Sequence, residues 1–173
     1  MQWYELLLSP LSLRSFSSLW FWIALVAFWT LVNRRVMGVP FDRVLAAREG
    51  DAEAASEAEA LARIEVRRRL RPSQGVRMVH VALAAFVGTA LTLLALAGLE
   101  LAQALALMIL PWLLIELLRQ RLARRLDAEA PDATTLVDRL IWHRLGTQAI
   151  GGIAIFVTVL WGAWRNLSLS IPH

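Results

Sequence analysis

Two histidines and one glutamate are the residues of this sequence that could do chemistry in apolar surroundings. His80 lies at the start of the apolar run 79–99, and His143 precedes the run 146–164. Two imidazoles on different helices at a similar depth could be the axial ligands of a b-type haem. Glu116 lies inside a third run, 101–118, where a carboxylate could relay protons or serve a small transporter. Both alternatives stay open at this point.

The same residues belong to a polar layer that has a simpler, structural interpretation. The layer gathers where the apolar runs end, and besides Glu116 and the two histidines its members are Asn33, Arg34, Arg77 and Arg144. Ionisable groups near a membrane span usually pair with one another, so an ion pair of Glu116 with Arg119, Arg77 or Arg144 is favoured over a proton relay. Because histidine is tolerated at head-group level without any ligand, we expect no cofactor here, with haem b as the minor alternative.

Enzyme chemistry has little support in these residues. The sequence contains no cysteine, which removes thiolate nucleophiles and cysteine-ligated metals. No serine or threonine has a recognisable nucleophile setting, and no histidine–carboxylate spacing is typical of a metal site. We therefore predict no catalytic residue, no metal ligand and no enzyme activity.

Helices that cross a membrane must position these side chains. With 58% hydrophobic residues and a mean hydropathy of +0.54, the 173-residue chain has more apolar residues than a protein surrounded by water can accommodate. Alternation of period two is absent, so helices of about 20 residues are expected to span the membrane. We predict an all-α fold: one membrane domain, 1–173, with a four-transmembrane-helix bundle formed by residues 16–33, 78–99, 101–118 and 143–164.

The arginines predict the orientation of these spans. All 18 basic residues are arginine, ten between residues 34 and 77 and six between 119 and 144, while only Arg14 and Arg165 lie on the other side. Since basic loops stay in the cytoplasm, segments 40–71 and 119–140 should be cytoplasmic and both termini periplasmic. Tryptophans prefer the interface, and Trp20, Trp22, Trp161 and Trp164 fall at the outer level. Residues 1–15 should lie along that outer interface, and 165–173 should form an outer tail.

The cytoplasmic segment 40–71 reads as two helices. Pro40 suits a helix start, and Gly50 with Asp51 supplies a stop and an N-cap before a second helix that ends near Pro72. The arginines that follow, Arg67, Arg68, Arg69 and Arg71, are balanced by acids and have only Phe41 as an aromatic neighbour. We therefore expect no nucleic-acid binding, and predict that these arginines anchor the inner interface and attract anionic lipid head groups.

Three stretches carry a family resemblance: RSFSSLWFWIALVAFW, VMGVPFDRV and HRLGTQAIGGIAIFVTVLWG. They resemble a group of small alphaproteobacterial membrane proteins labelled as a component of the Suf iron–sulfur assembly complex. The resemblance implies a location in the bacterial inner membrane. It implies no cluster chemistry, since the chain has neither cysteine nor an ATP-binding loop.

The function expected from these features is that of a non-catalytic accessory, scaffold or assembly subunit of a larger inner-membrane complex. Small residues at four-residue spacing, such as Ala84 with Gly88, favour close packing of helices within the chain or against a partner. The expected partners are membrane lipids and an integral membrane protein or a second copy of the chain.

Overall fold

The computed structural model describes residues 16, 19–34 and 36–170, and this part of the chain is all-helical. Its six helices are α2 (Leu19–Asn33), α3 (Phe41–Arg48), α4 (Ala52–Leu70), α5 (Gln74–Leu96), α6 (Glu100–Glu129) and α7 (Ala133–Ser170). Within the described ranges the extended structure is limited to an isolated bridge between Val36 and Val39. The predicted all-α class is confirmed.

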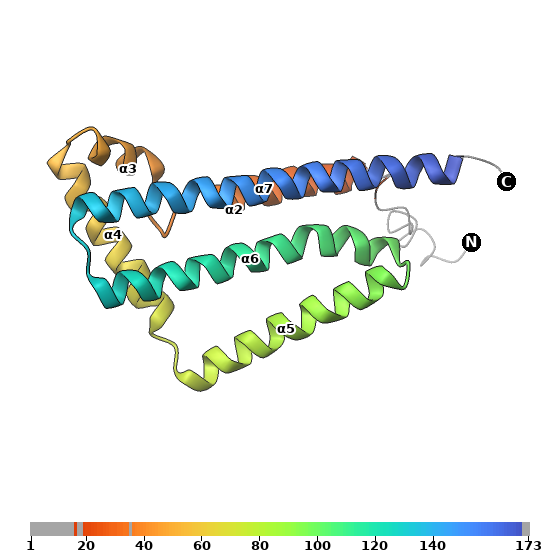
Figure 1. Cartoon of the computed structure of the whole chain (residues 1–173), viewed down its shortest axis with the longest axis horizontal. Coiled ribbons are helices and arrows are strands. Elements are labelled where there is room, and N and C mark those ends of the chain that lie inside the picture. The colour runs from red at the N-terminus through yellow and green to blue at the C-terminus, as the bar shows by residue number, and fades with distance from the viewer. Residues whose placement is uncertain (1–15, 17–18, 35, 171–173) are drawn as a thin grey trace, which may run out of the picture.

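Helices α2, α5, α6 and α7 lie side by side, and helices α3 and α4 gather at one end (Figure 1). α7 runs the length of the molecule with α2 beside it, α6 lies next to α7, and α5 is outermost. Helices α3 and α4 pack at the end where α6 stops and α7 starts, and α4 runs across the long helices there. The start of α2 and the end of α7 lie toward the opposite end of the molecule.

Three helices, α5, α6 and α7, are long and apolar enough to cross a membrane. The chain is therefore described as a membrane protein with three candidate spans. The expected first span, 16–33, contributes the 15-residue helix α2, about 22 Å long at 1.5 Å per residue and shorter than a hydrocarbon core of about 30 Å. Residues 1–15, 17, 18 and 171–173, with Trp3, Tyr4 and Arg14 among them, lie outside the described residues.

Glycines set the closest helix contacts of the bundle. A Cβ on Gly151 of α7 would lie 3.1 Å from the Trp29 ring of α2, so a side chain at this position would require the ring to shift by a few tenths of an ångström. Gly162, further along α7, faces Trp22 near the start of α2, which makes the pair antiparallel. Gly88 of α5 faces Leu110 and Leu113 of α6 at ordinary contact distance, as the expected tight hairpin requires.

The end where the short helices gather forms a packed unit that we call the cap: residues 36–70, 119–129 and 133–144. Its core joins α3, α4, the last turns of α6 and the first turns of α7. The buried members are Val36, Met37, Val39, Val44, Ala58, Ala62, Val66, Ala123, Leu126, Leu136, Val137, Leu140 and Ile141. Burial of these apolar side chains against one another stabilises the cap.

One segment has a different conformation from the one expected. The segment 119–140, expected as a loop, is almost entirely helical, because α6 continues to Glu129 and α7 begins at Ala133. The side chains of Ala123, Leu126, Leu136 and Leu140 supply the reason, since they face the cap core and burial there stabilises the extra turns. The expected outer tail is also helical as far as Ser170.

Helices α3 and α4 of the cap begin and end close to the residues that their sequence predicts. Gly50 has a φ of +100°, and the Asp51 side chain accepts hydrogen bonds from the Glu53 and Ala54 amides at 2.9 and 3.1 Å. Between α2 and α3, Met37 and Gly38 both have positive φ, so the chain reverses in a four-residue turn closed by the Val36–Val39 bridge.

Candidate functional site

An ionic cluster lies where α4 of the cap crosses α6. Glu116, on α6, accepts a hydrogen bond from Arg69 of α4 through one carboxylate oxygen and from Arg119 of α6, at 3.3 Å, through the other. Glu65, one turn before Arg69, accepts from the Arg69 Nε at 2.8 Å. The carboxylate of Glu116 is thus shared between two guanidinium groups from two helices, as the predicted structural ion pair requires.

Arg119 also closes the end of α2. Its guanidinium donates to the Val32 carbonyl at 2.6 Å, one of the last carbonyls of a helix that has no intrahelical partner for them. A cation at this end also complements the helix dipole. One side chain of α6 therefore links the end of α2 to Glu116 and, through Glu116, to α4.

The cluster is largely shielded from solvent, and this strengthens its charge pairs. The side chains of Arg69 and Arg119 are 19% and 14% exposed, whereas that of Glu116 is 36% exposed. Desolvation disfavours the charged form of Arg69, but the hydrogen bonds and charges of Glu116 and Glu65 outweigh it and raise the pKa of Arg69. Arg69 therefore stays protonated, and its charge holds the cap to α6.

The other residues of the predicted polar layer are only partly brought together. Arg144 of α7 places its guanidinium 3.8 Å from the centre of the Phe41 ring, in a cation–π contact inside the cap. Asn33 packs beside Gly151, and its Oδ1 is buried without a hydrogen-bond partner among the described residues. Arg34 lines a pocket with Arg69 and Arg119, whereas Arg77 lies in the first turn of α5 and is among neither the residues of this cluster nor those that line the pocket.

The two histidines belong to different parts of the molecule. His80 is exposed on α5, and its Nδ1 forms a 2.8 Å hydrogen bond with the Val76 carbonyl. His143 is half-buried on α7, and its Nε2 is buried without a partner among the described side chains. α6 lies between α7 and the first turns of α5 (Figure 1), so the structure gives no common site for the two rings.

No match to this chain was found among protein-family models, among curated proteins or among solved structures.

The predicted interface residues lie mostly on the surface. Trp20, Trp161 and Trp164 are exposed, and the Trp161 and Trp164 rings lie 5.1 Å apart. Trp22 is half-buried, and its Nε1 donates to the Phe16 carbonyl at 3.1 Å. Of the four arginines 67, 68, 69 and 71, only Arg69 points into the molecule, because Glu65 and Glu116 lie on that side.

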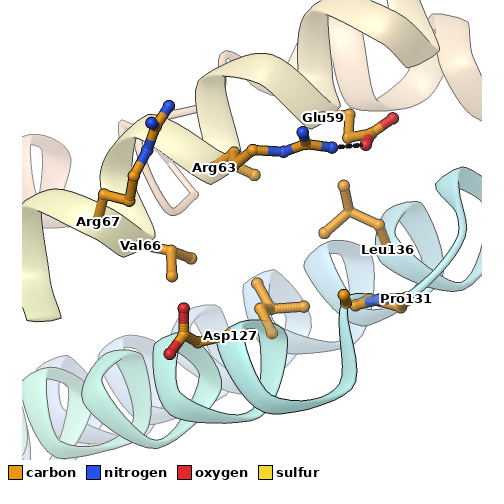
Figure 2. A pocket seen from close by; sticks show the side chains of 10 residues that line it. Glu59, Arg63, Val66, Arg67, Asp127, Pro131 and Leu136 are labelled. Carbon is orange, nitrogen blue, oxygen red and sulfur yellow. Dashed lines mark hydrogen bonds and ion pairs between the residues drawn. The ribbon is translucent and has the colours of Figure 1, made fainter.

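Two open cavities border the cap. The larger, of about 370 Å³, separates α4 from the turn between α6 and α7, with Val66, Leu136 and Pro131 along its wall (Figure 2). Figure 2 shows Arg63 paired with Glu59 on the α4 side and Asp127 on the opposite side. The smaller, of about 250 Å³, lies beside the ionic cluster at the end of α2 and is lined by arginines.

Several residues that hold the structure together were not expected from the sequence. Glu100 and Gln103, in the first turn of α6, accept hydrogen bonds from the Phe16 amide and the Trp161 indole. The cap core was also missed. Its signal is present in the sequence, since Ala54, Ala58, Ala62 and Val66 recur at four-residue spacing and form the buried stripe of α4.

Proposed function

We propose that this chain is a non-catalytic scaffold or accessory subunit that presents a rigid helical cap on a set of membrane helices. The observation that carries the proposal is that Glu116 forms ion pairs with two arginines. This acid in an apolar helix is engaged by Arg69 and Arg119, so its charge fastens the cap to the bundle instead of being free to move protons. A cap with its own packed core can hold a partner in a fixed position relative to the membrane.

We infer that α2 is a fourth membrane helix and that the cap is cytoplasmic. Leu19, Trp20 and Val26 of α2 are between 62% and 74% exposed, a surface that suits lipid, and α2 packs antiparallel on α7. The segment 34–77, which contains α3 and α4, has ten arginines in its sequence, and the segment 119–144 has six. By the positive-inside rule the cap faces the cytoplasm, with both termini in the periplasm of a bacterial inner membrane.

The surface that a membrane partner would cover is α5. This helix packs against α6, yet none of its 23 residues is buried. Large apolar side chains such as Phe86 and Leu96 are 71% and 79% exposed. Either lipid or the helix of a partner, a different integral membrane protein or a second copy, would cover this face.

Co-purification tests the proposal. The chain, tagged at its chromosomal locus, is extracted in a mild detergent, and the proteins that accompany it are identified by mass spectrometry. We expect a stoichiometric membrane-protein partner or a defined homo-oligomer. Ala58→Asp, which places a charge in the cap core, should remove the partner if the cap holds it. Ala60→Asp, at an exposed position of the same helix, should leave it bound. A monomer without partners would overturn the scaffold proposal.

The two chemical alternatives have tests of their own. A haem b carried by His80 and His143 would give a Soret band in the visible spectrum of the purified protein, lost in either histidine variant. Proton handling at Glu116 would make flux through reconstituted vesicles depend on that carboxylate. Flux that survives in Glu116→Gln would remove this alternative.

A further inference from the structure

Four arginines from three segments of the chain surround the smaller cavity beside the ionic cluster. Arg34 follows the last residue of α2, Arg68 and Arg69 belong to the last turn of α4, and Arg119 belongs to α6. We call this cavity the arginine pocket. Its volume of about 250 Å³ lies below the range of about 300–1,000 Å³ typical of sites for drug-sized ligands, so it suits a small group such as a phosphate.

The charges around the pocket do not cancel. Glu65 is the one acid among the residues that line it, against four arginines. Glu116, just behind Arg69 and Arg119, brings the acids to two, which leaves an excess of two positive charges. A concave site with a surplus of one sign attracts counter-ions of the other sign.

The four arginines divide into two kinds. Arg69 and Arg119 are held in place by Glu65, Glu116 and the Val32 carbonyl. Arg34 forms no ion pair with any described residue, and Arg68 approaches Glu65 only at 3.9 Å, with 82% of its side chain exposed. The two fixed guanidinium groups shape the pocket, whereas Arg34 and the exposed Arg68 have donors available for a ligand. Guanidinium groups bind phosphate through paired, charge-assisted hydrogen bonds.

One wall of the pocket is apolar and leads toward the membrane surface of α2. Leu31 and Val32 line the pocket, and Leu31 is 69% exposed. A ligand with a phosphate among the arginines and a hydrocarbon chain along Leu31 would satisfy both walls. A free phosphate ion would leave the apolar wall uncovered.

We propose that the arginine pocket binds the phosphate group of an anionic phospholipid at the junction of α2, α4 and α6. The lipid would occupy the angle between the cap and the bundle, and so fix the cap against the membrane surface. The proposal rests on the inferred position of the cap at the head-group level of the cytoplasmic leaflet. It does not require the protein partner of the scaffold proposal.

The test uses the full-length protein in detergent and native mass spectrometry with added lipid. Phosphatidylglycerol, phosphatidylcholine and inorganic phosphate are titrated separately. The pocket variant is the double substitution Arg34→Gln with Arg68→Gln, which leaves the ionic cluster intact. The matched control is Arg124→Gln with Arg125→Gln, which removes the same charge from exposed positions of α6 outside the pocket. Thermal unfolding confirms that each variant is folded.

We expect one saturable phosphatidylglycerol site that weakens at least about tenfold in the pocket variant and less than about twofold in the control. Phosphatidylcholine should bind more weakly than phosphatidylglycerol, and millimolar inorganic phosphate should not displace the lipid. Equal losses in both variants would mean diffuse charge attraction and overturn the site. Inorganic phosphate that binds as tightly as the lipid would overturn the lipid assignment. Failure of the co-purification experiment alone would leave this result unchanged.

Discussion

The cap and the membrane helices hide apolar side chains in different ways. In the cap, thirteen apolar residues from four helices and the α2–α3 turn are buried in one core. Among α2, α6 and α7 the main buried cluster has only four members, Leu25, Trp29, Ile115 and Ala154, and α5 has no buried residue. A buried core is what a unit that faces water requires, whereas lipid can cover the apolar surface of a helix without a cost in free energy.

The ionic cluster lies at the boundary between these two regions. Arg69 comes from the cap, Glu116 from a candidate membrane helix, and Arg119 from the continuation of that helix. Such a network is worth more at the edge of lipid than in water, because its charges are less screened there. Because the two regions differ in this way, a substitution in the cap or at its boundary should affect stability more than a matched substitution at an exposed position.

A charge in the cap core should have the largest effect. Ala58 is fully buried, so Ala58→Asp would bury an unpaired carboxylate and lower the free energy of unfolding of the cap by about 3–5 kcal/mol. Limited proteolysis between residues 40 and 71 measures this. Ala60→Asp, on the exposed side of α4, should change protection by less than about 0.5 kcal/mol. Equal protection in the two variants would contradict a packed cap.

Truncation of a leucine should have the next largest effect on stability, and this effect should differ between the cap and α5. Leu140 is fully buried in the cap core, and Leu140→Ala should cost about 3 kcal/mol through lost burial and a residual cavity. Leu96 on α5 is 79% exposed, so Leu96→Ala should cost less than about 0.5 kcal/mol, because lipid contacts the position in either case. Denaturation of the reconstituted protein, followed by tryptophan fluorescence, gives both values. A large cost at Leu96 would indicate that a partner or another helix covers α5.

Neutralising Glu116 should have an intermediate effect. Glu116→Gln leaves Arg69 and Arg119 with one fewer acid, and we expect a loss of about 2 kcal/mol, less than for a fully buried pair since Glu116 is 36% exposed. Glu59→Gln removes the partner of Arg63, which is 65% exposed, and should cost at most about 0.5 kcal/mol. A double-mutant cycle of Glu116→Gln with Arg69→Met isolates the pair. A coupling energy near zero would contradict the fastening role of the cluster.

Loss of a helix cap should have the smallest effect. Asp51 accepts two hydrogen bonds at the start of α4, and Asp51→Ala should lower the stability of the cap by about 1 kcal/mol. Ser73 caps α5 through one hydrogen bond of 3.4 Å, so Ser73→Ala should have a smaller effect. Hydrogen exchange at the first amides of the two helices compares them. A larger loss of protection in α5 than in α4 would reverse the expected order.

Much of the fold could be predicted because its signals are local. Gly50, Asp51 and Pro72 mark the bounds of α4, and the pairs of Glu59 with Arg63 and Glu65 with Arg69 follow from four-residue spacing. The role of Glu116 as an ion-pair acceptor was also predicted. Its partner Arg69 could not be, because 47 residues separate the two and nothing local indicates that α4 crosses α6.

The regions that were predicted wrongly depend on distant contacts. Residues 119–140 are polar enough to resemble a loop, yet Ala123 and Leu126 pack against the small-residue stripe of α4, and α6 continues for about three turns beyond residue 118. Hydropathy shows only where the residues of a helix cease to be apolar, so the predicted third span ended at residue 118. Contact with the cap decided where the helix stops.

The sequence alone determined the all-helical class, the helices suited to lipid and the arginine-rich end, because composition and periodicity are properties of each segment by itself. Only the tertiary structure decided that the arginine-rich end folds into a cap, that Arg119 closes α2, and that four arginines meet in one pocket. These features depend on the angle at which α4 crosses the long helices. That angle is fixed by the packing of small buried side chains against one another, which no single segment encodes.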